Sequence, residues 1–405
     1  MEHEDRNDGV ASYRDKMLQG IDTDRHDASL KGQSASGVDF APFFEPLTIG
    51  STTLPNRIAM APMTRNMSPG GVPDDKVAAY YRRRVEGGTG LVVTEGTYVP
   101  DPQAGFSPNV PRFYGQEALA GWSKVIDGVH AAGGCIWPQL WHVGLMPLPT
   151  DDFDVMDAIS PSGLLRRDEQ IGRAAQGEEI ERAIHAFGEA AATAYRLGCD
   201  GIQIHGAHGY FIDQFFWDVT NLRSDDYGGD DLVTRSRTAI RIVEACRAAT
   251  SPDFPISFRL SQWKQQDFTA RLAETPQELE RFLQPLADAG VDVFDCSTRR
   301  FWEPEFEGSD MNLAGWAKKL TGKLTSTVGS ITLSNDLFSG YVEGAETSTG
   351  NLVRLLEMFE RGDFDLFSVG RAAIADPAWA NKVRSGYTDE LAPFDIKFLM
   401  AAELN

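Results

Sequence analysis

Short apolar segments alternate with longer amphipathic segments along almost the whole chain. The short segments are rich in Val, Ile, Leu and Phe, and each is only seven or eight residues long. This length and composition are typical of buried strands rather than of helices. Eight such segments are therefore predicted to be strands: residues 57–63, 90–96, 135–141, 200–206, 255–261, 291–297, 324–330 and 364–371.

The longer segments have apolar residues at helical spacing. Several of them end in glycine immediately before the next strand, as helix C-caps do. Predicted helices cover residues 74–88, 116–133, 177–198, 232–250, 275–290, 311–322 and 349–362. Strands separated by helices, without a series of antiparallel hairpins, predict an α/β fold, a (β/α)8 TIM barrel in one domain over residues 39–405. An open doubly wound sheet is the alternative, and it explains eight regular units less well.

The first 38 residues differ from the rest of the chain. They are polar, charged and nearly free of periodicity, and they end in "KGQSASG". Residues 1–38 are therefore predicted to be a flexible N-terminal extension, with a short helix around residues 13–21.

Charge and cysteine content exclude several classes of function. The net charge is −21, and the sequence pI is about 4.7, so binding to nucleic acid or to an anionic membrane is not expected. No apolar run approaches the roughly 20 residues of a membrane helix, and "MEHEDRNDGV" lacks a signal peptide's apolar region. The four cysteines are far apart and form no C-x-x-C pair. We therefore expect reduced thiols and a cytoplasmic protein.

The segment after the fourth strand contains the strongest candidate chemistry. "HGAHGY" places His205, His208 and Tyr210 close together, and Gly206 and Gly209 predict a turn rather than the helix of a zinc-binding motif. Two structural histidines or a metal site are alternatives. The sharper interpretation is a pair of neutral donors that hold one carbonyl oxygen, with the tyrosine as a nearby acid.

Two arginines are predicted at strand ends, where a cation is costly unless it meets an anion. Arg259 ends the fifth strand and Arg371 follows the eighth. "TVGS" and "VGRAA" follow the seventh and eighth strands, where such barrels bind phosphate. A structural salt bridge is the alternative for Arg259, and Trp141 near Gln139 could belong to the core.

A pair of donors for a carbonyl oxygen, a nearby acid and a phosphate site together indicate a phosphate-bearing organic cofactor and no metal.

From about Phe43 to Pro377 the chain resembles the Old Yellow Enzyme family of FMN-dependent ene-reductases. The resemblance rests on a series of motifs in the family's order, of which the histidine-containing one and the one after it are highly specific. The motifs are "FFEPLTIG", "NRIAMAPMTRN", "TEG", "QLWHVG", "HGAHGYFIDQF", "LRSDDYGG", "VGS" and "GRAAIADP".

The resemblance implies a role for each matching residue. Tyr210 would donate a proton, and His205 and His208 would bind the substrate oxygen. Arg259 would face the N1–O2 side of the flavin, and Trp141 would contact substrate. FMN would be held by Ala61, Pro62, Met63, Thr64, Gly96, Gln139, His205, Arg259, Gly329, Ser330, Gly370 and Arg371.

The resemblance also implies the reaction. Tightly but non-covalently bound FMN would take hydride from NADH or NADPH and reduce the C=C bond of an α,β-unsaturated carbonyl or nitro compound, in a monomer or homodimer. A flavin barrel that oxidises amines or N-methyl groups is one alternative, and a non-catalytic flavin-binding sensor is another.

The sequence departs from the family pattern at several positions. At the position of Thr64, one branch of the family has threonine and another has cysteine. At the position of His208, the threonine branch often has asparagine, whereas this chain has histidine. "VFDCSTRRFWEPEF" after the sixth strand is unusual, and it makes Phe301 and Trp302 candidate substrate contacts. The sequence shows no match to the cysteine-rich second domain of dienoyl-CoA reductase relatives, so their iron–sulfur chemistry is not expected.

Overall fold

Eight parallel strands form a closed barrel in the computed structural model, which describes residues 35–146, 157–334, 349–395 and 397–400. The strand order is β10-β11-β12-β13-β14-β3-β4-β5, so each strand pairs with its neighbour in the chain and the last pairs with the first. Every predicted strand is confirmed: β3 (Ile58–Met60), β4 (Leu91–Tyr98), β5 (Cys135–Trp141), β10 (Ile202–His205), β11 (Ile256–Leu260), β12 (Val293–Ser297), β13 (Leu324–Val328) and β14 (Leu366–Val369).

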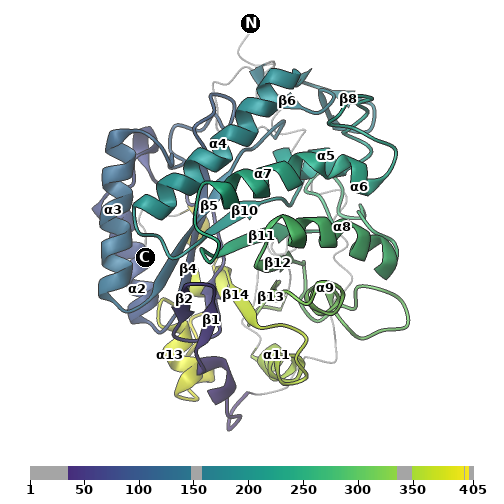
Figure 1. Cartoon of the computed structure of the whole chain (residues 1–405). Coiled ribbons are helices and arrows are strands. Elements are labelled where there is room, and N and C mark those ends of the chain that lie inside the picture. Colours follow the sequence, from purple (N-terminus) through teal and green to yellow (C-terminus); the bar gives the residue numbers. More distant parts are fainter. Residues whose placement is uncertain (1–34, 147–156, 335–348, 396, 401–405) are drawn as a thin grey trace, which may run out of the picture.

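Helices surround these strands (Figure 1), as the amphipathic segments predict. Capping side chains mark the first turn of several helices. The Asp74 carboxylate accepts hydrogen bonds from backbone N–H groups of α2, and Thr275 and Glu278 form a capping box at the start of α8. The segment predicted as one helix over residues 232–250 is two helices that join at Ser236. The helices are α2 (Asp75–Glu86), α3 (Gln116–Ala131), α4 (Gly177–Arg196), α6 (Leu232–Arg235), α7 (Arg237–Ala248), α8 (Pro276–Ala289), α9 (Leu313–Thr321) and α11 (Gly350–Glu360).

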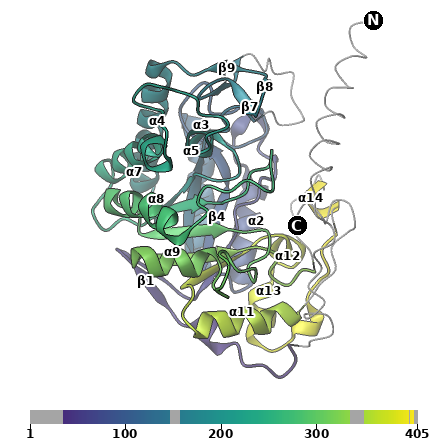
Figure 2. The same cartoon turned by 90° about the vertical axis from the view of Figure 1, so that its right-hand side faces the viewer.

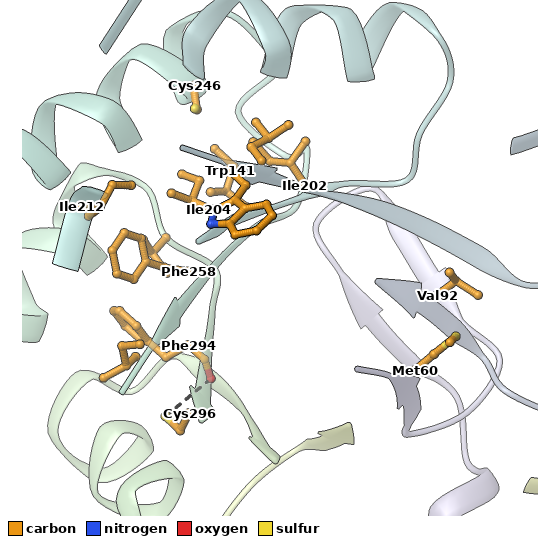
Figure 3. Packing of buried hydrophobic residues seen from close by; sticks show 14 of the residues in the cluster. Met60, Val92, Trp141, Ile202, Ile204, Ile212, Cys246, Phe258, Phe294 and Cys296 are labelled. Carbon is orange, nitrogen blue, oxygen red and sulfur yellow. Dashed lines mark hydrogen bonds between the residues drawn. The ribbon is translucent and has the colours of Figure 1, made fainter. Parts of the chain in front are cut away.

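The main core lies between the barrel strands and these helices. Ile202, Ile204 and Phe258 are fully buried and face the helices, as the alternation of the strands predicts. Figure 3 shows them packed with Ile212, from the short helix α5 (Phe211–Phe216), and with Cys246 of α7. The opposite faces of the same strands are therefore free to carry polar side chains inside the barrel.

A hairpin closes the amino-terminal end of the barrel. It is formed by β1 (Leu47–Ile49) and β2 (Thr52–Leu54), which the sequence patterns do not predict. The Ser51 N–H donates to the Asp253 carbonyl at 2.8 Å, and the Thr52 hydroxyl donates to the Asp200 carbonyl at 2.7 Å. Both carbonyls lie just before barrel strands. The hairpin therefore leaves only the carboxyl-terminal ends of the strands, here called the mouth, for a site.

Smaller elements lie outside the eight repeats, mainly on the mouth side (Figure 2). Two short sheets follow β5, and a one-and-a-half-turn helix follows the histidine motif. They are β6 (Ile159–Ser160) with β9 (Arg173–Ala174), β7 (Leu164–Arg166) with β8 (Glu169–Gln170), α5 (Phe211–Phe216), α12 (Arg371–Ala375), α13 (Trp379–Arg384) and α14 (Lys397–Met400).

The predicted N-terminal extension lies mostly outside the described residues, including the stretch at residues 13–21. The structure does describe residues 35–38. Ala35 is 1% exposed and belongs to the main core, and Val38 packs against that core. In the described part of the chain, no helix is both long and apolar enough to span a membrane.

Candidate active site

Three aromatic rings from the histidine motif meet at the mouth. His205 ends β10, and Tyr210 lies immediately before α5. The ring centroids of His205 and His208 are 5.3 Å apart, and those of His205 and Tyr210 are 5.0 Å apart. Both pairs meet edge to face. The structure thus brings together the three residues that the sequence places in one motif, and we refer to them as the ring cluster.

The turn between the two histidines folds in this way because of its glycines. A Cβ on Gly206 would lie 2.3 Å from the Phe258 ring, so a larger residue does not fit. His208 and Gly209 both have positive φ, 65° and 81°, which reverses the chain direction. The His208 N–H donates to the Ser261 hydroxyl at 3.0 Å, and the Gly209 N–H donates to the Asp213 carboxylate at 2.7 Å.

Burial decides the protonation of the ring cluster. It lowers the pKa of both His205 and His208 well below the usual value, and the nearby Arg259 cation lowers each pKa further. Both imidazoles are therefore neutral at pH 7. The Ala207 N–H donates to Nδ1 of His205 at 3.4 Å, which leaves Nε2 as the protonated nitrogen. Burial raises the pKa of Tyr210, so the phenol keeps its proton.

Trp141 forms the wall behind the ring cluster. Its indole stacks beside His205 at 6.1 Å and meets Tyr210 edge to face at 4.9 Å. A Cβ on Gly96 would lie 2.5 Å from this indole, which explains the glycine on β4. Trp141 is 1% exposed, so it is both a core residue and a neighbour of the candidate catalytic groups.

A chain of buried polar side chains crosses the inside of the barrel. The Gln139 amide donates to Gln203 at 2.8 Å, and the Gln203 amide donates to Asp295 at 3.2 Å. Asp295 also forms an ion pair with Arg259 at 2.6 Å. The Arg259 Nη2 group donates to the Ser297 hydroxyl at 3.3 Å, and that hydroxyl hydrogen-bonds Nε2 of His208 at 2.8 Å.

The salt bridge that was the alternative for Arg259 is therefore present, but it does not satisfy the whole guanidinium. Arg259 is 5% exposed, and its Nε has no hydrogen-bond partner among the described residues. A buried, unpaired donor beside the ring cluster is a place where a ligand atom would be stabilised. The sequence reasoning missed Asp295, although its inward position on the sixth predicted strand was a usable signal.

The predicted phosphate-binding residues gather at the ends of β13 and β14. Nη2 of Arg371 donates to the Ser330 hydroxyl at 3.4 Å, and Arg371 is 6% exposed. Gly329 has φ of 157°, and a Cβ there would lie 2.7 Å from the Thr298 carbonyl. The residues thus form one group, as the order of the two motifs predicts.

The segment after β3 lies next to this group. A Cβ on Gly370 would lie 3.5 Å from the Met63 sulfur and 3.6 Å from the Ala61 side chain. Ala61 is buried, Pro62 and Met63 are half-buried, and Thr64 is exposed. The predicted flavin-binding residues that follow β3 therefore extend from the predicted phosphate-binding group toward solvent.

Phe301 and Trp302 lie on the Gly329 side of the mouth. The Phe301 N–H donates to the Gly329 carbonyl at 3.1 Å, and the two aromatic rings meet edge to face at 5.1 Å. Phe301 is fully buried, whereas Trp302 is half-buried. Trp302 is thus the more accessible of the two predicted substrate contacts.

Sequence reasoning missed the segment that follows β11. Residues 261–266, "SQWKQQ", lie against the ring cluster, and the Trp263 indole stacks on His208 at 4.5 Å. The signal was available, because any loop after a barrel strand lies at the mouth and this one is rich in amide and aromatic side chains.

Glu95, the central residue of the "TEG" motif on β4, is a buried carboxyl with a strongly shifted pKa. Burial raises its pKa to about 7, although the N–H groups of Arg65 and Asn66 donate to it and oppose that effect. Between its usual pKa and 7, the folded protein holds a proton that the unfolded chain has released. The free energy of unfolding therefore falls as the pH rises through this range.

Glu95→Gln should remove this dependence. Between pH 5.5 and 8, the free energy of unfolding of the variant should rise relative to wild type by about 2 kcal/mol, since each pKa unit is worth about 1.4 kcal/mol. Urea unfolding at several pH values measures the difference. Glu117→Gln, at an exposed position of α3, is the control. A constant difference between the E95Q variant and wild type would show that Glu95 is ionised throughout.

Taken together, the fold and the site define a (β/α)8 barrel with neutral imidazoles, a phenol and buried cations at its mouth. Residues 42–390 match the family model of the NADH:flavin oxidoreductase / NADH oxidase family. The chain belongs to this family, and the resemblance to Old Yellow Enzyme is confirmed.

Known relatives agree with this assignment. 12-oxophytodienoate reductase 7 of Oryza sativa subsp. japonica is 39% identical over 227 residues, which cover 53% of this chain and 57% of the relative. A probable inactive reductase of Epichloe festucae var. lolii is 33% identical over 272 residues, which cover 65% of this chain and 69% of the relative. Across three plant reductases, the chain spans about 57% to 63% of the relative's length.

Solved structures show the same fold. Morphinone reductase in complex with tetrahydroNAD has a TM-score of 0.72 and 25% identity, with 88% of this chain and 93% of that chain covered. The Old Yellow Enzyme homologue from Zymomonas mobilis also has a TM-score of 0.72 and 25% identity, with 88% and 96% covered.

Proposed function

We propose that this protein is an FMN-dependent oxidoreductase that takes hydride from NADH or NADPH and reduces the C=C bond of α,β-unsaturated carbonyl or nitro compounds. The observation that carries the proposal is the ring cluster, in which two neutral imidazoles and one protonated phenol converge beside a buried arginine. Similarity to reductases of 12-oxophytodienoate and to morphinone reductase supports it.

The residues at the mouth fit FMN. Arg259 offers a buried Nε, unpaired within the described part of the chain, for the electron-rich edge of a flavin ring. Arg371, beside Ser330, offers a buried cation for a single terminal phosphate, which favours FMN over FAD. Gly96, Gln139, Gly329, Gly370 and the segment from Ala61 to Thr64 would complete the cofactor site. When bound, FMN would accept hydride from the nicotinamide and deliver it to the substrate.

The protein's own groups then act on the substrate oxygen and on one proton. Nε2 of His205 and the ring of His208 would hold the oxygen, and neutral donors suit this task because they polarise the oxygen without protonating it. Tyr210 would give its proton to the α-carbon, since its raised pKa keeps it protonated at neutral pH. Trp141 would hold the rings of His205 and Tyr210 in place.

The visible spectrum of the purified protein tests this proposal. We expect a flavin spectrum that NADH or NADPH bleaches and that a simple enone restores, with FMN released on denaturation. Reduction by an amine, rather than by a nicotinamide, would favour the amine dehydrogenase alternative. A flavin spectrum without turnover would favour the sensor, and absence of flavin after reconstitution would overturn the proposal.

Arg259→Met should weaken FMN retention and slow flavin reduction by the nicotinamide. Reduced flavin gathers negative charge, and a hydrogen bond to a charged group is worth roughly 1.5–3 kcal/mol, or about 10–100-fold in affinity. Fluorescence titration with FMN and stopped-flow reduction measure the two effects. Arg259→Lys keeps the cation and should retain more affinity. Unchanged affinity and rate in the R259M variant would mean that Arg259 serves only its ion pair with Asp295.

A further inference from the structure

The hydroxyl of Ser297 lies between two groups of the candidate active site. Ser297 ends β12 and is 4% exposed. Its Oγ lies 2.8 Å from Nε2 of His208, and it accepts a hydrogen bond from Nη2 of Arg259 at 3.3 Å. These are the two hydrogen bonds that the hydroxyl forms with the described residues. It therefore connects the buried cation with one histidine of the ring cluster.

The arginine decides which way the hydroxyl hydrogen of Ser297 points. A guanidinium only donates hydrogen bonds, so Arg259 occupies a lone pair of Oγ and cannot accept the hydrogen. Within the part of the chain that the structure describes, Nε2 of His208 is then the one acceptor within reach. A buried hydroxyl that leaves its hydrogen bond unmade loses free energy. The Ser297 hydroxyl therefore donates to Nε2.

This donation fixes the tautomer of His208. Burial and the Arg259 cation lower the pKa of His208 well below its usual value, so the ring is neutral and carries one proton. A ring nitrogen that accepts a hydrogen bond does not hold that proton. Because Nε2 is the acceptor, the proton lies on Nδ1. No described residue forms a hydrogen bond with Nδ1 of His208, so this N–H is available to a ligand.

The two histidines of the ring cluster therefore have opposite tautomers. The Ala207 N–H donates to Nδ1 of His205 at 3.4 Å, which leaves the proton of His205 on Nε2. His208 has its proton on Nδ1 instead. The two rings meet edge to face, with centroids 5.3 Å apart. Each ring thus keeps one N–H for a shared oxygen, as a pair of donors requires.

The Trp263 indole keeps the His208 ring turned toward Ser297. It stacks on the imidazole with ring centroids 4.5 Å apart and ring planes 25° apart. Its Nε1 donates to the Ser297 carbonyl at 3.1 Å, so the indole and the imidazole are both attached to the same residue. The His208 N–H donates to the Ser261 hydroxyl at 3.0 Å, which holds the backbone of the turn. Rotation of the imidazole away from Ser297 would therefore disrupt the stacking as well as the hydrogen bond.

We propose that Ser297 is a positioning residue for substrate binding: its hydroxyl holds His208 as the tautomer that presents Nδ1–H to the substrate oxygen. The inference rests on the proposed ene-reduction, in which this histidine is one of two donors to that oxygen. Ser297 acts through the imidazole and need not touch the substrate. Without the hydroxyl, the ring can also take the other tautomer, which offers the substrate oxygen a lone pair instead of an N–H.

Nitrogen NMR of the FMN-loaded protein with ¹⁵N-labelled histidine reads the tautomers directly. The protonated and unprotonated nitrogens of a neutral imidazole have well-separated chemical shifts. At neutral pH we expect a protonated Nδ1 and an unprotonated Nε2 for His208, and the reverse for His205. The signals are assigned by their loss in His208→Asn and His205→Asn. In Ser297→Ala, both His208 signals should move toward the average of the two tautomers.

Ser297→Ala should also weaken the binding of phenols to the FMN-loaded enzyme by about 3–10-fold, the value of one ordinary hydrogen bond. Titration of the flavin spectrum measures this affinity. Ser326→Ala is the matched control and should bind phenols as wild type does. Ser326 is also 4% exposed, but it lies on the neighbouring strand β13, and its hydroxyl pairs with Ser368 instead of a histidine. In a His208→Ala background, Ser297→Ala should cause no further loss, because its effect passes through the missing imidazole.

A proton on Nε2 of His208 in the wild-type protein would overturn the proposal, and this measurement does not depend on whether a Ser297 variant folds. Wild-type phenol affinity in Ser297→Ala would overturn it as well, as would a loss that adds to that of His208→Ala. Failure of the proposed function has a different signature. The wild-type enzyme would then reduce no enone, whereas the NMR spectrum would still report the tautomer of His208.

Discussion

Tyr210→Phe should slow reoxidation of the reduced flavin by a simple enone by roughly 10²–10⁴-fold, the usual contribution of a positioned general acid. The substitution removes one proton and almost no volume. Binding of FMN and reduction by NADH or NADPH should therefore stay close to wild type, since neither step uses the phenol proton. Stopped-flow spectroscopy resolves the two half-reactions in one experiment.

The choice of oxidant supplies the control for this prediction. A strongly activated nitroalkene should lose much less rate in Tyr210→Phe, because its nitronate survives without a proton. If flavin reduction falls as much as enone reduction, Tyr210 belongs to the binding site and is not the proton donor. If neither step changes, water supplies the proton.

His205→Ala and His208→Ala should each lower enone turnover by roughly 10²–10³-fold, the typical cost of one lost donor to a developing oxyanion. Each should also weaken the binding of phenols, whose oxygen mimics that of the substrate. Titration of the flavin spectrum with a phenol measures this affinity. His208→Asn keeps an N–H donor and should retain more affinity than His208→Ala.

The neutrality of the two imidazoles adds a pH test. Burial and Arg259 lower the pKa of both histidines well below 6.5, so both stay uncharged as the pH falls from 8 toward 6. Phenol affinity should therefore show no transition from these residues in that range. His185→Ala, at an exposed position of α4, is the control. Normal phenol binding in either active-site variant would show that the oxygen is held elsewhere.

The eight strands and the helices between them could be predicted from the sequence because the relevant physics is local. An apolar run of seven residues has to be buried, and a glycine before the next strand ends a helix regardless of its tertiary surroundings. The ring cluster could be predicted for a similar reason. His205, His208 and Tyr210 lie within six consecutive residues, and the positive φ angles of His208 and Gly209 reverse the chain between them.

The ion pair of Arg259 and the hairpin at the amino-terminal end could not be predicted, because both depend on how the barrel closes. Asp295 lies beside Arg259 because β11 and β12 pair in one particular register, and the sequence of either strand alone does not specify that register. The hairpin of β1 and β2 has only three residues in each strand, too few for a periodic signal, and it is stabilised by carbonyls that precede other strands.

The sequence by itself therefore determined the barrel, the histidine motif proposed to be catalytic and the end of the strands at which that motif lies. Only the tertiary structure decided that Glu95 is buried deeply enough to have a pKa near 7, that Arg259 keeps a donor without a partner among the described residues, and that Trp263 stacks on His208. Periodicity and turn residues act between neighbours in the chain. Burial, pKa values and hydrogen bonds between loops depend instead on groups that only barrel closure brings within a few ångströms.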